Sequence, residues 1–255
     1  MILVVSDLHL GKSDQRDKTS LTELKDCINH YSPELRHVIF LGDTFDAFIE
    51  YPKYIPAAVN QWTDFVRGFQ ASGLTITYVA GNHDRWHRGY IKGVLGREVQ
   101  REAFQLNLGR HRISFEHGDR ADSVSPLVRF ARSVSDSKLM LKLFTAFLPF
   151  GGGQWIASQV SRRFAGFEPN RKTVKALEIH AEKLLQSDSC NVVVMGHCHQ
   201  ASFSRSENGT YINTGDWFEG RTFALIGSEA NPRLVLAKWT GESSKILSEE
   251  LFSSI

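Results

Sequence analysis

The sequence predicts an α/β fold, and three observations lead to this prediction. Short runs rich in β-branched residues recur along the chain and alternate with segments of helical spacing. These runs are apolar at almost every position, which is typical of parallel strands buried on both faces. Each strong run then ends in a cluster of polar residues. We therefore expect a parallel sheet covered by helices.

The expected elements follow in a regular order. In the first third of the chain a strand is followed by a helix, twice, before a third strand begins. The last three strands lie close together in sequence, so we expect them to pair antiparallel. The expected strands cover residues 1–7, 37–43, 74–84, 111–119, 191–199, 210–217, 221–227 and 233–239, and the first two helices cover 18–30 and 55–69.

The strand pattern is interrupted in the second half of the chain, where helical spacing dominates over 123–150, 155–164 and 170–186. We expect one domain over residues 1–255, with a helical cap inserted at 120–188. Between residues 120 and 175 there are ten Lys or Arg against three Asp or Glu, a net charge of +7, and this stretch is also rich in Leu and Phe. Because the whole chain carries only +2, the remainder carries −5.

Composition excludes several classes of protein. With 255 residues, 42% hydrophobic and 23% charged, the chain is neither disordered, nor collagen-like, nor a coiled coil. Three cysteines are too few for a disulfide framework, which indicates a reducing compartment. The apolar run at the N-terminus stops at Asp7 without a basic leader, which favours a strand over a signal peptide. We expect a cytoplasmic protein, either soluble or peripheral on the inner face of the membrane.

Five strand ends carry the residue types that bind metals. Ligand sites in open α/β sheets lie beyond the carboxyl ends of the strands, so these clusters should converge. Carboxylate, imidazole and amide oxygen together suit Mn²⁺, Fe²⁺ or Zn²⁺. The clusters are Asp7-Leu8-His9, Gly42-Asp43-Thr44-Phe45-Asp46, Gly81-Asn82-His83-Asp84, Glu116-His117-Gly118-Asp119 and Gly196-His197-Cys198-His199.

The chemistry of this set indicates two metal ions. Asp43 ends the middle strand, and a single carboxylate there could bridge both ions. Such a pair would clamp a phosphoryl group and generate hydroxide at neutral pH. Strand alternation turns Cys198 away from its neighbours His197 and His199, so we expect it to pack in the core. Four histidines fit no cluster and are expected on the surface or on helices: His30, His87, His111 and His180.

The ordered motifs resemble those of the calcineurin-like metallophosphoesterase family. The resemblance covers the core, and it implies a β-sandwich of two mixed sheets flanked by helices. It further implies that His83, oriented by Asp46, stabilises or protonates the leaving oxygen while a metal-bridging hydroxide attacks. By the same resemblance, one metal would be held by Asp7, His9, Asp43 and His199, and the other by Asp43, Asn82, His117 and His197.

The basic, apolar cap resembles one branch of that family, the UDP-2,3-diacylglucosamine hydrolases of lipid A biosynthesis. This implies a Mn²⁺ enzyme that cleaves the pyrophosphate of a nucleotide-linked lipid, giving UMP and 2,3-diacylglucosamine 1-phosphate. Asp122, Asn170 and Lys172 would bind the glucosamine phosphate headgroup. The apolar content of the cap favours a membrane surface over nucleic acid. The alternative for these helices is ordinary packing on the core, with solvated charges on their outer faces.

Two positions depart from the branch, which carries Arg in place of His83 and Glu in place of Asp46. A second hypothesis is therefore a metallophosphodiesterase, or a nucleotide or lipid diphosphate hydrolase, of the same superfamily with another substrate. A third hypothesis, a non-catalytic scaffold, predicts missing ligands, and every ligand of the motif set is present in the sequence.

Overall fold

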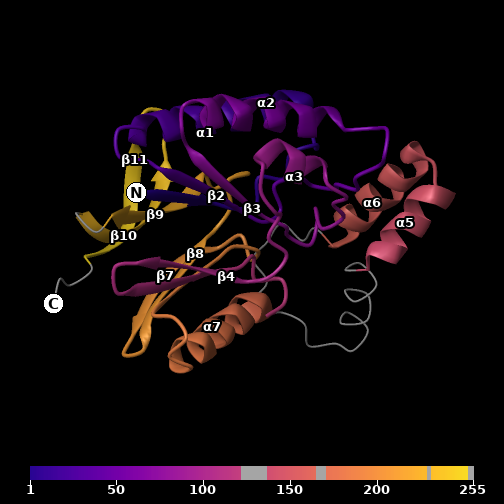
Figure 1. Cartoon of the computed structure of the whole chain (residues 1–255). Helices are drawn as coiled ribbons and strands as arrows, with labels where there is room; N and C mark the ends of the chain where they lie inside the picture. The colour runs from indigo at the N-terminus through magenta and orange to yellow at the C-terminus, as the bar shows by residue number, and fades with distance from the viewer. Residues whose placement is uncertain (122–136, 165–170, 229–230, 252–255) are drawn as a thin grey trace.

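The structure, a computed structural model of the 255-residue chain, describes residues 1–121, 137–164, 171–228 and 231–251. Its core is a sandwich of two mixed β-sheets flanked by helices (Figure 1). The α/β fold class is therefore confirmed. The helices are α1 Asp14–Tyr31, α2 Ala57–Ala71, α3 Tyr90–Leu95, α5 Lys138–Phe147, α6 Phe150–Phe164 and α7 Arg171–Gln186.

The first sheet contains the predicted parallel strands. β1 (Ile2–Val5), β2 (His37–Leu41) and β3 (Thr75–Val79) pair in parallel, with β2 in the centre. On the other side of β1 the sheet continues antiparallel through β9 (Thr222–Ser228), β10 (Asn231–Trp239) and β11 (Ser244–Leu251). The sheet is therefore mixed, and its parallel half carries the first three polar strand ends.

The second sheet has the order β4-β5-β6-β8-β7. Its strands are β4 Phe104–Leu108, β5 His111–Phe115, β6 Val192–Met195, β7 Ala201–Ser206 and β8 Gly209–Thr214. β5, β6 and β8 run parallel to one another, and the two edge strands run antiparallel to them. The remaining two polar strand ends, after β5 and β6, thus lie side by side.

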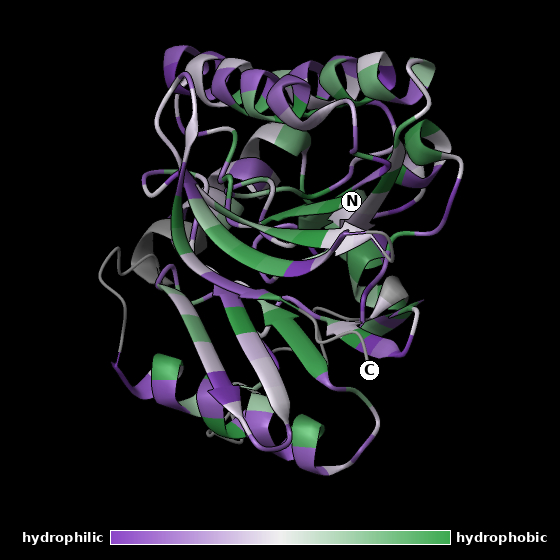
Figure 2. Cartoon of the chain, turned by 90° about the vertical axis from the view of Figure 1, so that its left-hand side faces the viewer, coloured by the Kyte–Doolittle hydropathy of each residue, from purple (hydrophilic) through white to green (hydrophobic). Residues whose placement is uncertain are grey.

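The apolar runs of the strands are explained by burial on both faces. In β1, Val4 faces the second sheet, whereas Leu3 and Val5 pack under α1 and α2. In β6, alternate residues likewise face the first sheet and α7. Figure 2 shows the strands of the first sheet mostly in the hydrophobic colour, with hydrophilic residues on the outward faces of the helices. Such double burial removes the polar alternation that marks half-exposed strands.

The expectation that the last three predicted strands pair with one another is wrong for the first of them. β8 joins the second sheet, where Ile212 packs between the sheets and Tyr211 packs against α7. Both faces of β8 are therefore covered in this position. The loop from Gly215 to Arg221 carries the chain across to the first sheet, where β9 and β10 pair antiparallel as expected.

The predicted insertion at 120–188 contains two kinds of helix. α7 packs on the second sheet through Leu177, Ala181 and Leu185, all of which are buried. α5 and α6 lie at the end of the sandwich where the parallel strands of the first sheet finish (Figure 1). The part of the insertion that could act as a cap is therefore α5 and α6.

Candidate metal centre

The loops that follow β1 and β2 run side by side and are joined by backbone hydrogen bonds. The N–H of Asp7 donates to the carbonyl of Gly42 at 3.1 Å, and the N–H of His9 donates to that of Asp43 at 3.0 Å. This pairing continues the parallel register of the two strands beyond their ends. It brings the first two polar clusters of the sequence together.

Asp7, His9 and His199 form the first group of ligand atoms, all within 4.8 Å of one another. The Nε2 atoms of the two histidines lie 3.1 Å apart. They face Oδ1 of Asp7 at 3.9 Å from His9 and 3.2 Å from His199. If both Nε2 atoms are unprotonated, three electron-rich atoms face one point, an arrangement that a cation among them would stabilise.

Asp43, His117 and His197 form the second group. The Nε2 of His117 lies 3.3 Å from Oδ2 of Asp43 and 3.3 Å from Oδ1 of Asn82. Its Nδ1 donates to the backbone carbonyl of Leu41 at 2.9 Å, which turns Nε2 towards the other ligands. All seven residues predicted as ligands therefore lie in two adjoining groups.

Asp7 and Asp43 each accept a backbone hydrogen bond through one of their two carboxylate oxygens. Oδ2 of Asp7 accepts the N–H of His197 at 3.0 Å, and Oδ1 of Asp43 accepts the N–H of His83 at 2.9 Å. Oδ1 of Asp7 is buried and accepts no well-aligned hydrogen bond from any described residue. A buried carboxylate oxygen left in this way costs free energy, and a metal ion would satisfy it. The donor set thus fits divalent metals.

The pKa values reflect the same concentration of negative charge. Burial opposes ionisation of Asp7, but the adjacent His199 ring outweighs it and lowers the pKa of Asp7 to about 2. Burial likewise opposes the charged form of His117, but Asp43 raises the pKa of His117 to about 10. Because a histidine must be deprotonated to bind a metal, a metal ion at this position would displace a proton from His117.

Strained backbone supports the ligands. A positive φ is uncommon outside glycine and is tolerated chiefly where the surroundings require it. The values of φ lie between 48° and 71° at Asp7, His9, Asp43, His197 and His199. Aspartate and histidine adopt this conformation more often than most residues, but nothing in the sequence showed at which positions they would do so.

Two glycines of the motifs are required by close packing. A Cβ on Gly42 would overlap the His117 ring, and one on Gly81 would overlap the Asp43 carboxylate. Gly42 also has φ +88°, which a larger residue rarely adopts. These glycines let neighbouring strand ends approach closely enough to share ligands.

His83 lies beside the second group, with Nε2 3.8 Å from Oδ2 of Asp43. Asp46 does contact His83, but through its backbone carbonyl oxygen, which lies 2.7 Å from Nδ1 of His83. The Asp46 carboxylate points instead to Nδ1 of His9 at 3.5 Å and Nζ of Lys12 at 3.2 Å. The His83 ring therefore presents Nε2 to the metal groups.

Asp84, the last residue of the Gly-Asn-His-Asp motif, joins the loops. Its buried carboxylate accepts the N–H of Gly81 at 2.7 Å, the N–H of Phe45 at 3.2 Å and the hydroxyl of Tyr78 at 2.5 Å. Burial and the charge of Asp43 raise the pKa of Asp84 to about 6. The sequence placed Asp84 in the motif, but only the structure shows that it ties two strand ends together.

Other predicted residues have mixed outcomes. Cys198 is buried against α7, as expected. The expectation for His87 is wrong: it is 6% exposed and packs between Phe48 and Tyr78, because the loop after β3 turns back into the core. Lys172 lies exposed in the first turn of α7. Asp122 and Asn170 lie outside the described residues.

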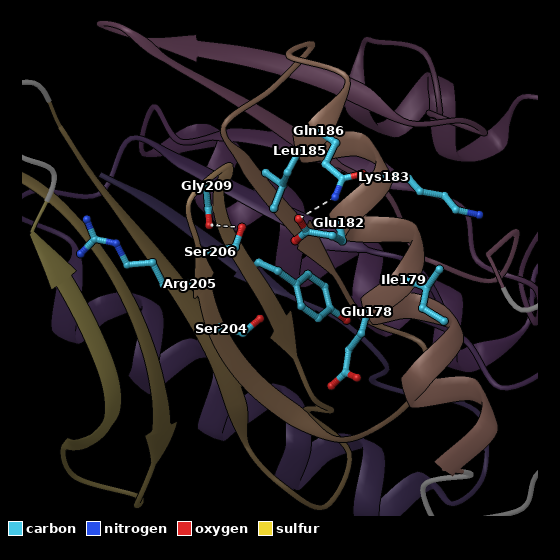
Figure 3. Close-up of a pocket in the computed structure, with 11 residues that line it drawn as sticks. Glu178, Ile179, Glu182, Lys183, Leu185, Gln186, Ser204, Arg205, Ser206 and Gly209 are labelled. Carbon is cyan, nitrogen blue, oxygen red and sulfur yellow. Dashed lines mark hydrogen bonds between the residues drawn. The ribbon is translucent and has the colours of Figure 1, made fainter.

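Two hollows differ in their relation to the metal groups. One of about 300 Å³ is lined by His199 together with the loop of Asp216, Phe218, Glu219 and Gly220. A larger one, of about 570 Å³, lies between α7 and the β7–β8 hairpin (Figure 3). None of the described residues that line the larger one is a predicted ligand. The smaller hollow is therefore the one that belongs to the candidate site.

Comparison with known proteins agrees with this geometry. The profile of the calcineurin-like phosphoesterase family matches residues 1–201. A UDP-2,3-diacylglucosamine hydrolase of Porphyromonas gingivalis is 29% identical over 119 residues, which cover 46% of this chain. The match spans only 45% of that relative's length, somewhat under half.

Similar solved structures share the fold at low identity. A Vps29 mutant from Entamoeba histolytica is 14% identical with a TM-score of 0.50, and 99% of each chain is covered. The phosphoesterase Yfce from E. coli is 12% identical with a TM-score of 0.50 and the same coverage. The family profile covers well over half of the chain, and the strand ends carry the family's motifs in order. This protein belongs to the calcineurin-like phosphoesterase family of metal-dependent hydrolases.

Proposed function

We propose that the protein hydrolyses the pyrophosphate of UDP-2,3-diacylglucosamine, releasing UMP and 2,3-diacylglucosamine 1-phosphate. The observation that supports this substrate is an exposed apolar helical surface anchored on the loops of the candidate metal centre. The two groups of ligand residues would account for the phosphoester chemistry. The helical surface would account for binding of the lipid part of the substrate. The likeness to the Porphyromonas gingivalis hydrolase over part of its length is consistent with both.

The seven ligand residues would hold two divalent ions, for which Mn²⁺ is our proposal and Fe²⁺ or Zn²⁺ the alternatives. Bound ions would polarise the phosphoryl oxygens and provide a nucleophilic water at neutral pH. His83 would donate a proton to the leaving oxygen from Nε2, because Nδ1 is held by the Asp46 carbonyl. The backbone N–H of His83 donates to Oδ1 of Asp43, which holds the proposed proton donor next to a ligand residue.

The helices α5 and α6 are attached to the loops that carry Asp46 and His83. Leu141 of α5 is buried in a cluster with Ile49 and Tyr51, against which Trp86 and Phe144 also pack. The side chain of Gln154 donates to the carbonyl of Ile49 at 3.1 Å. The loops involved follow β2 and β3 directly. A lipid held on these helices would therefore lie next to the metal groups.

α5 is apolar on its outer face as well as its inner face. Leu139, Leu143 and Phe147 follow at intervals of four residues, so they share one side of the helix, and they are 64%, 42% and 81% exposed. Trp155 of α6 is 63% exposed. We call these four side chains the α5–α6 apolar surface. Large exposed apolar side chains on one side of a helix are typical of an interaction site, which here is proposed for acyl chains and a membrane surface.

Among the described residues, no helix combines the length and apolar character needed to cross a bilayer. The proposed membrane contact is therefore peripheral and made through α5 and α6. The headgroup roles of Lys172, Asp122 and Asn170 stay part of this proposal. We expect no nucleic-acid substrate, because the exposed residues here are Leu and Phe without the polar spacing of a stacking groove.

The test is to incubate Mn²⁺-loaded protein with UDP-2,3-diacylglucosamine and measure UMP. The expected result is stoichiometric UMP and 2,3-diacylglucosamine 1-phosphate. UDP-N-acetylglucosamine, which lacks acyl chains, is the matched substrate control and should react far more slowly. Brisk cleavage of bis(p-nitrophenyl) phosphate without any UMP from the lipid would instead establish the second hypothesis, a phosphodiesterase with another substrate.

A further inference from the structure

Two cations lie over one aromatic ring at the edge of the candidate metal centre. The Arg16 guanidinium carbon is 3.6 Å from the centroid of the Phe218 ring, and Nζ of Lys12 is 4.3 Å from it. Lys12 belongs to the turn after β1, Arg16 to the first turns of α1, and Phe218 to the loop after β8. We call these three residues the Phe218 cluster. Cations are attracted to the face of an aromatic ring, so the ring places both charges.

The ring itself is rigidly held. Phe218 is 4% exposed, and its N–H donates to the carbonyl of Asp7 at 3.1 Å. The next residue back, Trp217, donates its N–H to Ser6 at 3.0 Å. The Arg221 guanidinium donates to the carbonyls of both Trp217 and Phe218. The loop is therefore fixed to the end of β1, which carries a predicted ligand.

The cluster adjoins the metal groups on the side of His9 and His199. The Phe218 ring lies edge-on to the His9 ring, with centroids 5.9 Å apart. Nζ of Lys12 is 3.2 Å from the Asp46 carboxylate, which is 3.5 Å from Nδ1 of His9. Phe218 and His199 line the same hollow of about 300 Å³, together with Asp216, Glu219 and Gly220. Lys12 and Arg16 do not line it but lie against the Phe218 ring, and Arg16 pairs with Glu219 of the lining. A substrate group that extends from the predicted ligands to the Phe218 ring would therefore approach both cations.

The existing partners of the cations can be exchanged. Arg16 pairs with Glu219 at 2.9 Å, but the two side chains are 42% and 62% exposed, and exposed pairs contribute little. Lys12 is 20% exposed, with Nζ between Asp46 and the ring, and an ammonium can bind a second anion while it keeps the first. Arginine and lysine bind phosphate strongly through charge-assisted hydrogen bonds.

We propose that Lys12 and Arg16, held on Phe218, bind the second phosphate of a diphosphate-linked substrate while the first lies at the metal groups. This inference rests on the proposed function, since it assumes that the metal groups hold the phosphoryl group under attack. It assigns the selection of diphosphates over simple diesters to the Phe218 cluster. The chemical class recognised is two adjacent phosphoryl groups, each with a negative charge.

The experiment compares two substrates across matched variants. Lys12→Met and Arg16→Gln should each raise KM for UDP-2,3-diacylglucosamine about tenfold or more, the effect of losing a charge-assisted hydrogen bond. KM for bis(p-nitrophenyl) phosphate, which has one phosphorus, should rise much less. Lys12→Arg should restore most of the difference. Lys18→Met, which removes an exposed cation of α1 that pairs with Asp14, should change neither KM.

Equal changes of KM for both substrates in Lys12→Met and Arg16→Gln, or no change for either substrate, would overturn the inference. A separate measurement covers the case in which the wild type releases no UMP and the proposed function fails. There, inhibition of diester hydrolysis by UDP-N-acetylglucosamine is compared with inhibition by UMP. If the wild type is inhibited more tightly by UDP-N-acetylglucosamine than by UMP, and both Lys12→Met and Arg16→Gln abolish this difference, the Phe218 cluster binds the second phosphate. If the ratio of the two inhibition constants is unaltered in both variants, the inference is refuted.

Discussion

The backbone N–H of His197 donates to Oδ2 of Asp7 at 3.0 Å, across 190 positions of the sequence. This bond joins the last metal-ligand motif of the chain to the first. It uses one carboxylate oxygen for structure and leaves Oδ1 turned towards His9 and His199. The two β-sheets are thereby joined at the point where the ligands must be placed accurately.

Asp43→Asn should reduce bound metal and lower hydrolysis by about 100-fold or more, because both proposed ions depend on this carboxylate. The amide retains an oxygen that can accept the His83 N–H, so the fold should persist. Metal content by elemental analysis and the rate with bis(p-nitrophenyl) phosphate measure the effect. Asp64→Asn, at an exposed position of α2, is the control. Full activity with two metals retained would rule out the bridging role.

His83→Ala should lower kcat while metal content stays unchanged, because His83 is proposed to protonate the leaving oxygen and not to bind metal. General acid catalysis contributes about 10²–10⁴-fold. The loss should be large for an alkyl leaving group and small for p-nitrophenolate, which departs without a proton. The same loss for both leaving groups would assign His83 a different role.

Gly81→Ala should destabilise the protein by about 1–3 kcal/mol, because the added Cβ overlaps Asp43. Gly68→Ala is the matched control, since nothing lies within 4 Å of its added Cβ and the position is inside α2. That variant should gain about 0.5–1 kcal/mol from helix propensity. Urea unfolding measures both values. Equal stability of the two variants would contradict the packing argument.

His87→Phe should reduce the loss of stability in acid. Burial lowers the pKa of His87 to about 3, whereas the unfolded chain binds the proton near pH 6.5. Between these values the unfolded state holds more protons, so stability falls as the pH falls, by up to about 3 kcal/mol between pH 7 and pH 4. Unfolding free energies at several pH values test this, and a slope identical to that of the wild type would refute it.

His87→Leu removes the same titration with different packing in the pocket between Phe48 and Tyr78. It should therefore show the same reduced slope as His87→Phe, at a different absolute stability. The pair separates the effect of the proton from the effect of shape.

Phe147→Ser combined with Trp155→Ser should weaken binding to phospholipid vesicles and raise KM for the lipid substrate several-fold, because both side chains are largely exposed on the α5–α6 apolar surface. Vesicle sedimentation and UMP release measure the two effects. Hydrolysis of the water-soluble diester should persist, because neither residue lies among the metal groups. Unchanged vesicle binding would show that these helices are not the membrane contact.

The sequence by itself determined the fold class and the grouping of the ligands. Apolar runs such as residues 38–41 are buried on both faces, and a polar motif such as Gly81-Asn82-His83-Asp84 follows the end of each such strand closely. Parallel strands end at the same edge, so strand position alone predicted that Asp7, Asp43 and Asn82 would lie close together. The resemblance to the family rested on the same motifs, and the family profile confirmed it.

The tertiary structure decided what depends on contacts between distant segments. Three features arise from packing across more than one element. They are the burial of His87, the place of β8 in the second sheet and the contact of the Lys12 ammonium with the Phe218 ring. The positive φ of Asp7 and His199 is likewise imposed by neighbouring strand ends. Local patterns report the burial of a segment but not its partner, because many partners can bury the same apolar face.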